Sequence, residues 1–189
     1  MEVIKSPIDG VLIIEPKVFE DARGYFFESF SQREFDEKIT SILGAAIHFV
    51  QDNESMSSYG VVRGLHYQNP PYSQAKLVRC VRGRIISLAL DIRKDSPSYG
   101  KCLQTELSQD NRKFEFIPRG FAHGFISLEN GSIVQYKCDN YYNKAEMFGV
   151  NVLDPALEIS IPFGTDNAII SEADQCLPLL RDVMSPFVK

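Results

Sequence analysis

The chain is dominated by short segments with β-type residue patterns, separated by turns rich in Gly, Pro, Asn and Asp. Segments 21–24 (Asp-Ala-Arg-Gly) and 129–131 (Glu-Asn-Gly) are turns of this kind. Many short strands at close spacing are typical of an antiparallel sandwich or barrel. We predict strands at 11–14, 25–30, 48–51, 75–81, 84–91, 101–107, 114–117, 122–127 and 133–138.

Helix is predicted in two places only. Ser31 and Glu34 resemble a capping box at the start of a helix over 31–42. A second helix begins near Ser171 and is brief or irregular, because Pro178 interrupts it. We assign the 189 residues to a single domain, 1–189, since a chain of this length can bury one substantial core.

The charge balance argues against two classes of partner. The net charge is -5, whereas a nucleic-acid backbone or an acidic membrane surface requires a basic face. The first residues lack a signal-peptide pattern, and no apolar run reaches membrane-spanning length. We therefore expect no nucleic acid, no membrane and a cytoplasmic protein. In that compartment the four separated cysteines are expected to be reduced packing residues: Cys80, Cys102, Cys138 and Cys176.

Two glycine-rich segments, 60–68 and 117–125, each carry one histidine. The metal-binding form of the small jelly-roll barrel called the cupin has Gly, five residues and His-x-His, then Glu, six residues and Gly, and later Pro-x-Gly-x-x-His. Here His66 keeps the first spacing and His123 closes an intact last motif, but Gln68 and Lys76 replace the second histidine and the glutamate. An amide and an ammonium group cannot complete a divalent metal site. We therefore predict a cupin-type double-stranded β-helix without metal or other cofactor.

Without a metal, this residue set is suited to proton transfer next to a ketone. His66 can act as the base because imidazole titrates near neutral pH, and Lys76 can stabilise the enolate oxygen. If Tyr136 returns the proton on the opposite face, the carbon is inverted, which is epimerisation. A carboxylate on the second ring nitrogen would orient the base. The candidates, which the residues alone do not rank, are Asp91, Asp154 and Asp174.

Characteristic stretches run along nearly the whole chain, at 15–19, 21–28, 49–55, 63–68, 74–80, 91–97, 117–125 and 136–142. On these stretches the chain resembles the dTDP-4-dehydrorhamnose 3,5-epimerase family. The resemblance implies epimerisation at C3 and C5 of dTDP-4-dehydro-6-deoxy-D-glucose to dTDP-4-dehydro-L-rhamnose, in dTDP-L-rhamnose biosynthesis. It also implies that His66 is the base, paired with Asp174, that Tyr136 is the acid, and that Lys76 stabilises the enolate.

The same resemblance implies residues that hold the nucleotide sugar. The counterparts of Arg63 and His123 approach the diphosphate. The nucleotide pocket is lined by the counterparts of Gln51, Asp52, Asn53 and Tyr142, and Glu146 matches a further binding residue with a one-residue shift. Arg23 and Glu28 match residues that a neighbouring subunit supplies across an exchanged N-terminal strand, which implies a homodimer. The chain departs from the family at Ala173 and in having no tryptophan.

Three other functions stay open on the sequence. One is epimerisation at a single carbon, C3 or C5, of a related 4-keto-6-deoxy nucleotide sugar. The others are a sugar-binding cupin without catalysis and a metal-dependent cupin oxygenase. The missing ligands and the acid and base residues argue against the last two.

Overall fold

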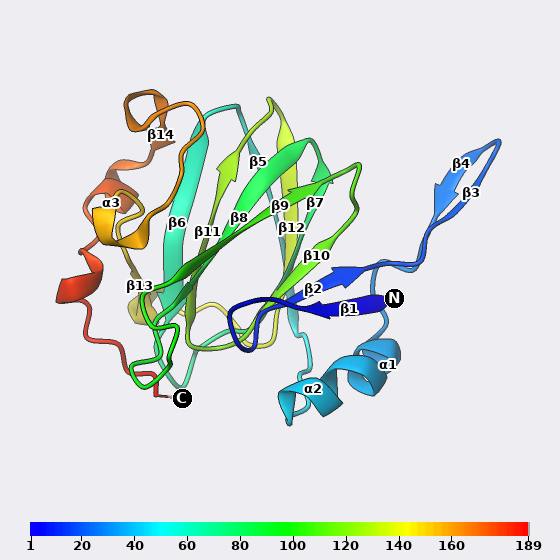
Figure 1. The fold of residues 1–189 in the computed structure, drawn as a ribbon, viewed down its shortest axis with the longest axis horizontal. Coiled ribbons are helices and arrows are strands. Elements are labelled where there is room, and N and C mark those ends of the chain that lie inside the picture. The colour runs from blue at the N-terminus through cyan, green and yellow to red at the C-terminus, as the bar shows by residue number, and fades with distance from the viewer. Residues whose placement is uncertain (189) are drawn as a thin grey trace.

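Two mainly antiparallel sheets face each other and form most of the fold (Figure 1). The computed structural model describes residues 1–188. The first sheet has the order β1 (Glu2–Lys5), β2 (Leu12–Glu15), β10 (Phe114–Ile117), β7 (Lys76–Arg82), β12 (Ser132–Cys138) and β5 (Gln51–Ser57). The second has the order β13 (Met147–Gly149), β6 (Val61–Gln68), β11 (Phe121–Ser127), β8 (Arg84–Asp91) and β9 (Cys102–Ser108).

Smaller elements surround the two sheets. The strand β14 (Ile169–Ile170) pairs in parallel with β6. The hairpin of β3 (Phe19–Asp21) and β4 (Gly24–Phe26) extends away from the sheets (Figure 1). The helices are α1 (Gln32–Phe35), the π-helical η1 (Asp36–Thr40), α2 (Ser41–Leu43) and α3 (Glu172–Gln175). The 3-10 turns are η2 (Lys144–Glu146), η3 (Pro155–Leu157), η4 (Thr165–Asn167) and η5 (Leu180–Asp182).

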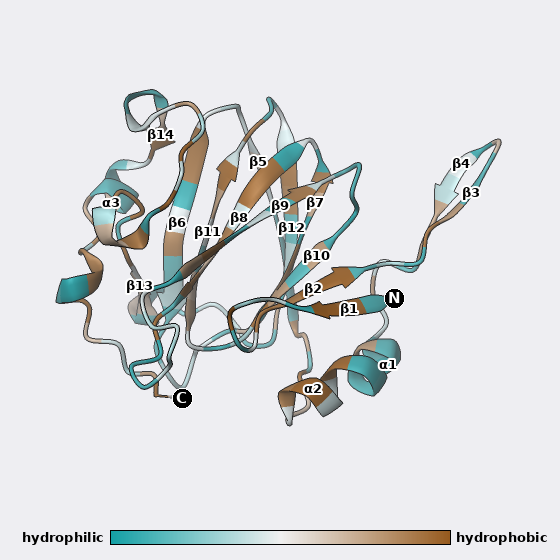
Figure 2. Cartoon of the chain, viewed as in Figure 1, coloured by the Kyte–Doolittle hydropathy of each residue, from teal (hydrophilic) through white to brown (hydrophobic). Residues whose placement is uncertain are grey.

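Strand alternation divides the core into layers. Ile85 and Ala89 of β8 pack between the sheets, against Val78 of β7. Their neighbours Leu88 and Leu90 face the other way, against the C-terminal segment. Figure 2 shows hydrophobic residues along β2, β6 and β8. A third cluster lies between the first sheet and the helical segment, and its buried members are Leu12, Ile14, Phe35, Ile39, Ala75, Leu77, Phe114 and Phe116.

The predicted helices are confirmed in place. α1, η1 and α2 follow one another over 32–43, and the Ser31 hydroxyl accepts a hydrogen bond from the Glu34 amide at 3.3 Å. The second helix is as brief as Pro178 predicts, because α3 ends at Gln175. None of the helices in residues 1–188 is long and apolar enough to cross a membrane.

The strand predictions fail mainly at the polar strand β5. The prediction at 48–51 is wrong, because the strand begins at Gln51 and continues to Ser57. Its sequence, Gln-Asp-Asn-Glu-Ser-Met-Ser, has low β-propensity, and its polar residues serve a cavity rather than a core. The strand predicted at 25–30 extends only over β4. The strands predicted from the sequence do not include β6, which carries His66, or the short strands β1, β3, β13 and β14.

Candidate active site

His66 and His123 lie opposite each other on the paired strands β6 and β11. Arg63 precedes His66 by three positions, so a regular strand would place the two side chains on opposite faces. The register shifts between these positions, because the two residues 64–65 of β6 lie opposite one residue of β11. This bulge turns Arg63 and His66 toward the same cavity, which His123 also lines.

The bulge depends on Gly64. Its φ is +96°, a left-handed conformation that side chains rarely adopt. A Cβ atom there would lie 2.7 Å from the His123 carbonyl oxygen. The Gly64 amide also donates a hydrogen bond to Oδ2 of Asp174 at 3.1 Å. Gly64 therefore shapes the strand and fixes the carboxylate beside it.

Asp174 is the carboxylate that contacts His66. Its Oδ1 lies 2.7 Å from Nε2 of His66, and the residue is only 7% exposed. The pairing of β14 with β6 brings this segment alongside, and the Ser171 hydroxyl caps α3 by accepting a hydrogen bond from the Asp174 amide. With Nε2–H donated to Asp174, Nδ1 of His66 is left to accept a proton.

The other two candidate carboxylates have structural roles. Asp91 accepts hydrogen bonds from Arg93 and from the hydroxyl groups of two nearby serines. Asp154 accepts from the backbone amides of Ala156 and Leu180. The structure thus selects Asp174 among the three that the sequence left open.

A cavity of about 550 Å³ is lined by six of the predicted site residues, the four predicted catalytic residues together with Arg63 and His123. Lys76 and Tyr136 enter it from neighbouring strands of the first sheet, opposite the histidines of the second. The Lys76 ammonium lies 5.8 Å from the centre of the Tyr136 ring. The lining comprises Ser55, Val61, Val62, Arg63, His66, Lys76, His123, Gly124, Phe125, Tyr136, Ile169, Ile170, Ser171 and Asp174.

Burial sets the electrostatics of this cavity. It lowers the pKa of Lys76 and raises the pKa of Tyr136, so the phenol stays protonated near neutral pH. The pKa of His123 lies well below the ordinary histidine value because of burial and then the nearby Lys76. The cavity therefore holds a protonated phenol, a lysine side chain whose charged form is disfavoured by burial, and a neutral imidazole around the dyad of His66 and Asp174.

The predicted nucleotide residues separate into two groups. Gln51, Asn53 and Tyr142 line an adjoining hollow of about 130 Å³, which shares His66, Lys76 and Tyr136 with the main cavity. The Tyr142 amide donates to the side-chain oxygen of Gln51 at 3.1 Å. Asp52 lies between them in β5 and points to the other face, where it pairs with Lys137 at 2.9 Å.

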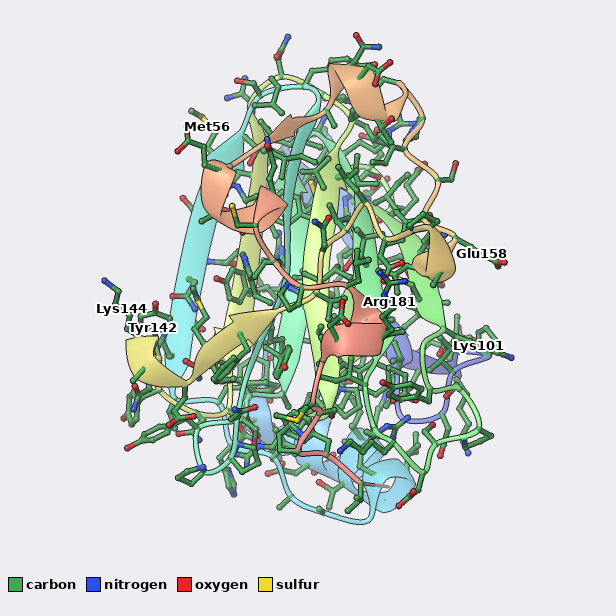
Figure 3. The ribbon with its side chains drawn as sticks, turned by 90° about the vertical axis from the view of Figure 1, so that its left-hand side faces the viewer. Met56, Lys101, Tyr142, Lys144, Glu158 and Arg181 are labelled. Atoms are coloured by element: carbon green, nitrogen blue, oxygen red, sulfur yellow. The ribbon has the colours of Figure 1, made fainter. Side chains whose placement is uncertain are left out.

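The ends of the site lie far apart along β5. Arg63 donates hydrogen bonds to the Met56 carbonyl and to the Ser57 hydroxyl, each at 3.1 Å. Figure 3 shows Met56 at one end of this edge and Tyr142 near the other. Ser55 also lines the cavity, and its buried hydroxyl has no hydrogen-bond partner among residues 1–188. Ser55 was not among the residues predicted from the sequence, although it continues the alternation of Gln51 and Asn53.

Three further predicted residues lie away from the cavity of their own chain. Arg23 is on the extended hairpin, exposed and paired with Asp21. Glu28 lines a separate groove beside the hairpin and α1. Glu146 ends the turn η2 and is half-buried. The structure of one chain therefore does not bring these three together with His66.

Gln68, at the position of the second cupin histidine, holds two loops. Its amide nitrogen donates to the carbonyl oxygens of Tyr72 and Tyr141, at 2.7 and 3.2 Å. Its amide oxygen accepts from the Asn143 amide at 2.7 Å. The side chain thus shapes the rim beside Tyr142.

The chain is similar to known proteins over nearly its whole length. The family model described as dTDP-4-dehydrorhamnose 3,5-epimerase matches residues 5–182. A protein of that name from Shigella flexneri is 47% identical over 174 residues, covering 92% of this chain and 93% of the relative. The crystal structure of such an epimerase from Elizabethkingia anophelis is 46% identical with a TM-score of 0.89, covering 96% and 97% of the two chains.

Two further structures carry sugar nucleotides. A Legionella pneumophila epimerase in complex with dTDP-4-keto-L-rhamnose is 41% identical with a TM-score of 0.89, covering 96% and 94% of the chains. A 3'-monoepimerase from Streptomyces bikiniensis in complex with dTDP-quinovose is 30% identical with a TM-score of 0.85, covering 93% and 86%. The predicted cupin-type barrel is confirmed by the structure and these neighbours. The chain belongs to the dTDP-4-dehydrorhamnose 3,5-epimerase family, and its activity is that of an isomerase.

Proposed function

We propose that this chain carries out the family reaction by two-base chemistry without a cofactor, epimerising C3 and C5 of dTDP-4-dehydro-6-deoxy-D-glucose. The single observation that carries the mechanism is the dyad of His66 and Asp174, which share one cavity with Lys76 and Tyr136. His66 removes the proton, Tyr136 returns one on the opposite face, and the configuration of the carbon is inverted.

The geometry of the substrate favours one base for both carbons. C3 and C5 flank the C4 ketone, and in the glucose chair their hydrogens are both axial on the same face of the ring. His66 and Tyr136 stand on opposite sheets, so they can address opposite faces of a sugar lying between them. Each enolate places its charge on the same oxygen, O4, where Lys76 can stabilise it.

The diphosphate of the substrate requires a cationic side chain, and its thymidine requires an aromatic one. Arg63 is the group we assign to the diphosphate, because guanidinium nitrogens match phosphate oxygens. Tyr142, with Gln51 and Asn53 beside it, is the group we assign to the thymidine. His123 lies deeper, 6% exposed, and we place it near the sugar rather than at the cavity mouth.

We also propose a homodimer that completes the site. The hairpin of β3 and β4 extends from the barrel and exposes Phe19, Tyr25 and Phe26 at 54, 55 and 70%. Exposed apolar side chains on a protruding hairpin favour burial against another chain. Arg23 and Glu28 would then enter the partner's site, where each chain lacks them.

We expect the enzyme to act in the cytoplasm, where cysteines stay reduced. Its four cysteines are free.

Product analysis tests the proposal. Purified enzyme, treated with a chelator, is incubated with the 4-keto-6-deoxy-D-glucose nucleotide in D2O and followed by NMR. We expect deuterium and inversion at both carbons. Change at one carbon only supports the single-centre alternative, which the related 3'-monoepimerase keeps open. Loss of turnover after chelation contradicts the cofactor-free mechanism.

A further inference from the structure

A carboxyl group that the proposed mechanism does not use lies inside the barrel. Glu115 of β10 is 0% exposed. Its Oε1 accepts a hydrogen bond from the Thr105 hydroxyl at 2.8 Å, and its Oε2 accepts one from the Ser87 hydroxyl. Within residues 1–188 it forms no ion pair with a lysine or arginine. A buried carboxyl group without a cation is costly when ionised, so it needs an explanation.

Ser87 connects this carboxyl group to the active site. Its Oγ lies 3.4 Å from Nε2 of His123, and His123 lines the substrate cavity. The other ring nitrogen of His123, Nδ1, makes no hydrogen bond to residues 1–188. A chain of contacts therefore runs from Glu115 through one hydroxyl group to an imidazole beside Lys76.

The single proton of the Ser87 hydroxyl makes this chain directional. When Glu115 is ionised, Ser87 donates to it and can only accept from His123, which places the imidazole proton on Nε2. When Glu115 is protonated, it can donate to Ser87, and Ser87 can then donate to Nε2. The imidazole proton then moves to Nδ1. One proton on Glu115 thus exchanges the donor and acceptor ends of His123.

We propose that Glu115 is a positioning residue for the reaction, which acts through Ser87 to set the tautomer that His123 presents beside Lys76. The inference rests on the proposed function, in which His123 lies near the sugar. The Nδ1–H form can donate to a substrate oxygen, whereas the other form can only accept.

The ionised and the protonated forms of Glu115 are both accessible near neutral pH. Burial raises the pKa of Glu115 to about 7, while the hydrogen bonds from Ser87 and Thr105 oppose that rise. The other titratable or charged groups on the strands around Glu115 are Glu15 of β2, Lys76, Arg79, Cys80 and Arg82 of β7, Arg84 and Asp91 of β8, Cys102 and Glu106 of β9, and His123 of β11. Asp91 is bound to Arg93, and the pKa values of Cys80 and Cys102 are raised to about 11 and 12, so these three groups do not change charge near pH 7.

Histidine side-chain NMR tests the tautomer directly. The chain has three histidines, so replacing His48 and His66 in turn assigns the ring nitrogens of His123. We expect the His123 proton to move from Nδ1 to Nε2 as the pH rises through about 7. Glu115→Gln should remove this change, because the amide cannot ionise.

Two more variants and a matched control separate a hydrogen-bond relay through Ser87 from simple packing. Thr105→Val removes a hydrogen bond to Glu115 but does not touch His123, so it should move the midpoint to higher pH. Ser87→Ala should leave His123 unresponsive. Glu106→Gln, the same change at an exposed glutamate of β9, should leave the midpoint where it is. A tautomer that is constant with pH in the wild type, or that still switches in Glu115→Gln, overturns the inference.

Kinetics separate this inference from the proposed function. We expect the pH profile of wild-type kcat, but not that of KM, to show a titration with the same midpoint as the tautomer change. The pH profile of Glu115→Gln should lack this titration. If wild-type enzyme does not epimerise the sugar, the proposed function fails while the NMR result still stands. If it epimerises the sugar and its kcat profile is identical in Glu115→Gln, the inference alone fails.

Discussion

His66 and His123 are register partners on adjacent strands, yet their surroundings differ. The His66 side chain is 33% exposed and contacts Asp174 directly, at 2.7 Å. His123 is 6% exposed and contacts a carboxyl group only through Ser87. Burial and the distance to the carboxylate, rather than the residue type, thus separate the proposed base from the proposed neutral hydrogen-bonding group.

Replacing each histidine in turn is the strongest way to break this comparison. His66→Ala should lower kcat by about 10³ to 10⁴, because a general base contributes on this scale. His123→Ala should lower kcat less, by about 10 to 10², since it positions and donates rather than removes the proton. Deuterium exchange rates measure both, with exposed His48→Ala as the control. Equal losses at His66 and His123 would contradict the division of roles.

Asp174, the carboxylate that contacts His66, is the next residue to replace. Asp174→Asn keeps a side chain of the same shape but cannot hold His66 in the required tautomer, so we expect kcat to fall by about 10² or more. KM should change little, because the two carboxylate oxygens of Asp174 are already engaged by His66 and Gly64, although the residue borders the cavity. A variant with full kcat would mean that His66 acts without its dyad partner.

The pH dependence of kcat tests the role of Lys76, which lies in the same cavity as both histidines. Since burial lowers its pKa, the ammonium form should be lost at a pH below the ordinary lysine range, and kcat should fall there. Lys76→Arg should abolish this alkaline limb, because arginine stays protonated. Lys76→Met should cost about 10² in kcat by removing the cation at the enolate. An unchanged alkaline limb in Lys76→Arg would assign it to another group.

The smallest expected effect is on stability. The folded-state pKa of Glu115 is raised to about 7, above its ordinary value of 4.5, so the folded protein binds more protons between these limits. The contribution of Glu115 to wild-type stability should therefore fall as the pH rises from 4.5 to 7, whereas the depressed pKa of His123 contributes in the opposite sense. Glu115→Gln should lose this dependence, gaining on the order of 2–3 kcal/mol relative to wild type between pH 4 and pH 8. Urea unfolding at the two pH values measures it, and parallel behaviour of both proteins would show that Glu115 is not held neutral.

The sequence predicted the barrel and the positions of the candidate site residues unevenly. Strands 84–91 and 114–117 were predicted with their observed bounds, because their alternating or continuous apolar residues are core signals. β5 was placed wrongly because its alternate residues Gln51, Asn53 and Ser55 face a polar cavity and leave no apolar alternation. Asp174 could not be ranked from spacing, since its position depends on β14 pairing with β6 more than 100 residues away in sequence.

Glu115 is a second residue whose partners could not be predicted from the sequence. A glutamate between two phenylalanines in a predicted strand gives no sign of its partners, because Ser87 and Thr105 come from two other strands. The bulge at 64–65 is also invisible in the alternation pattern, although Gly64 marks the place. Side-chain chemistry was readable from the sequence, whereas cross-strand register was not.

Tyr136→Phe tests the central claim most directly, because it separates removal of the proton from its return on the other face. In D2O the variant should still exchange hydrogen for deuterium at C3 and C5, since His66 can return a deuteron on its own face. It should invert neither carbon at an appreciable rate. Inversion at the wild-type rate would contradict the assignment of Tyr136 as the acid, and loss of exchange together with inversion would contradict a base that works independently of it.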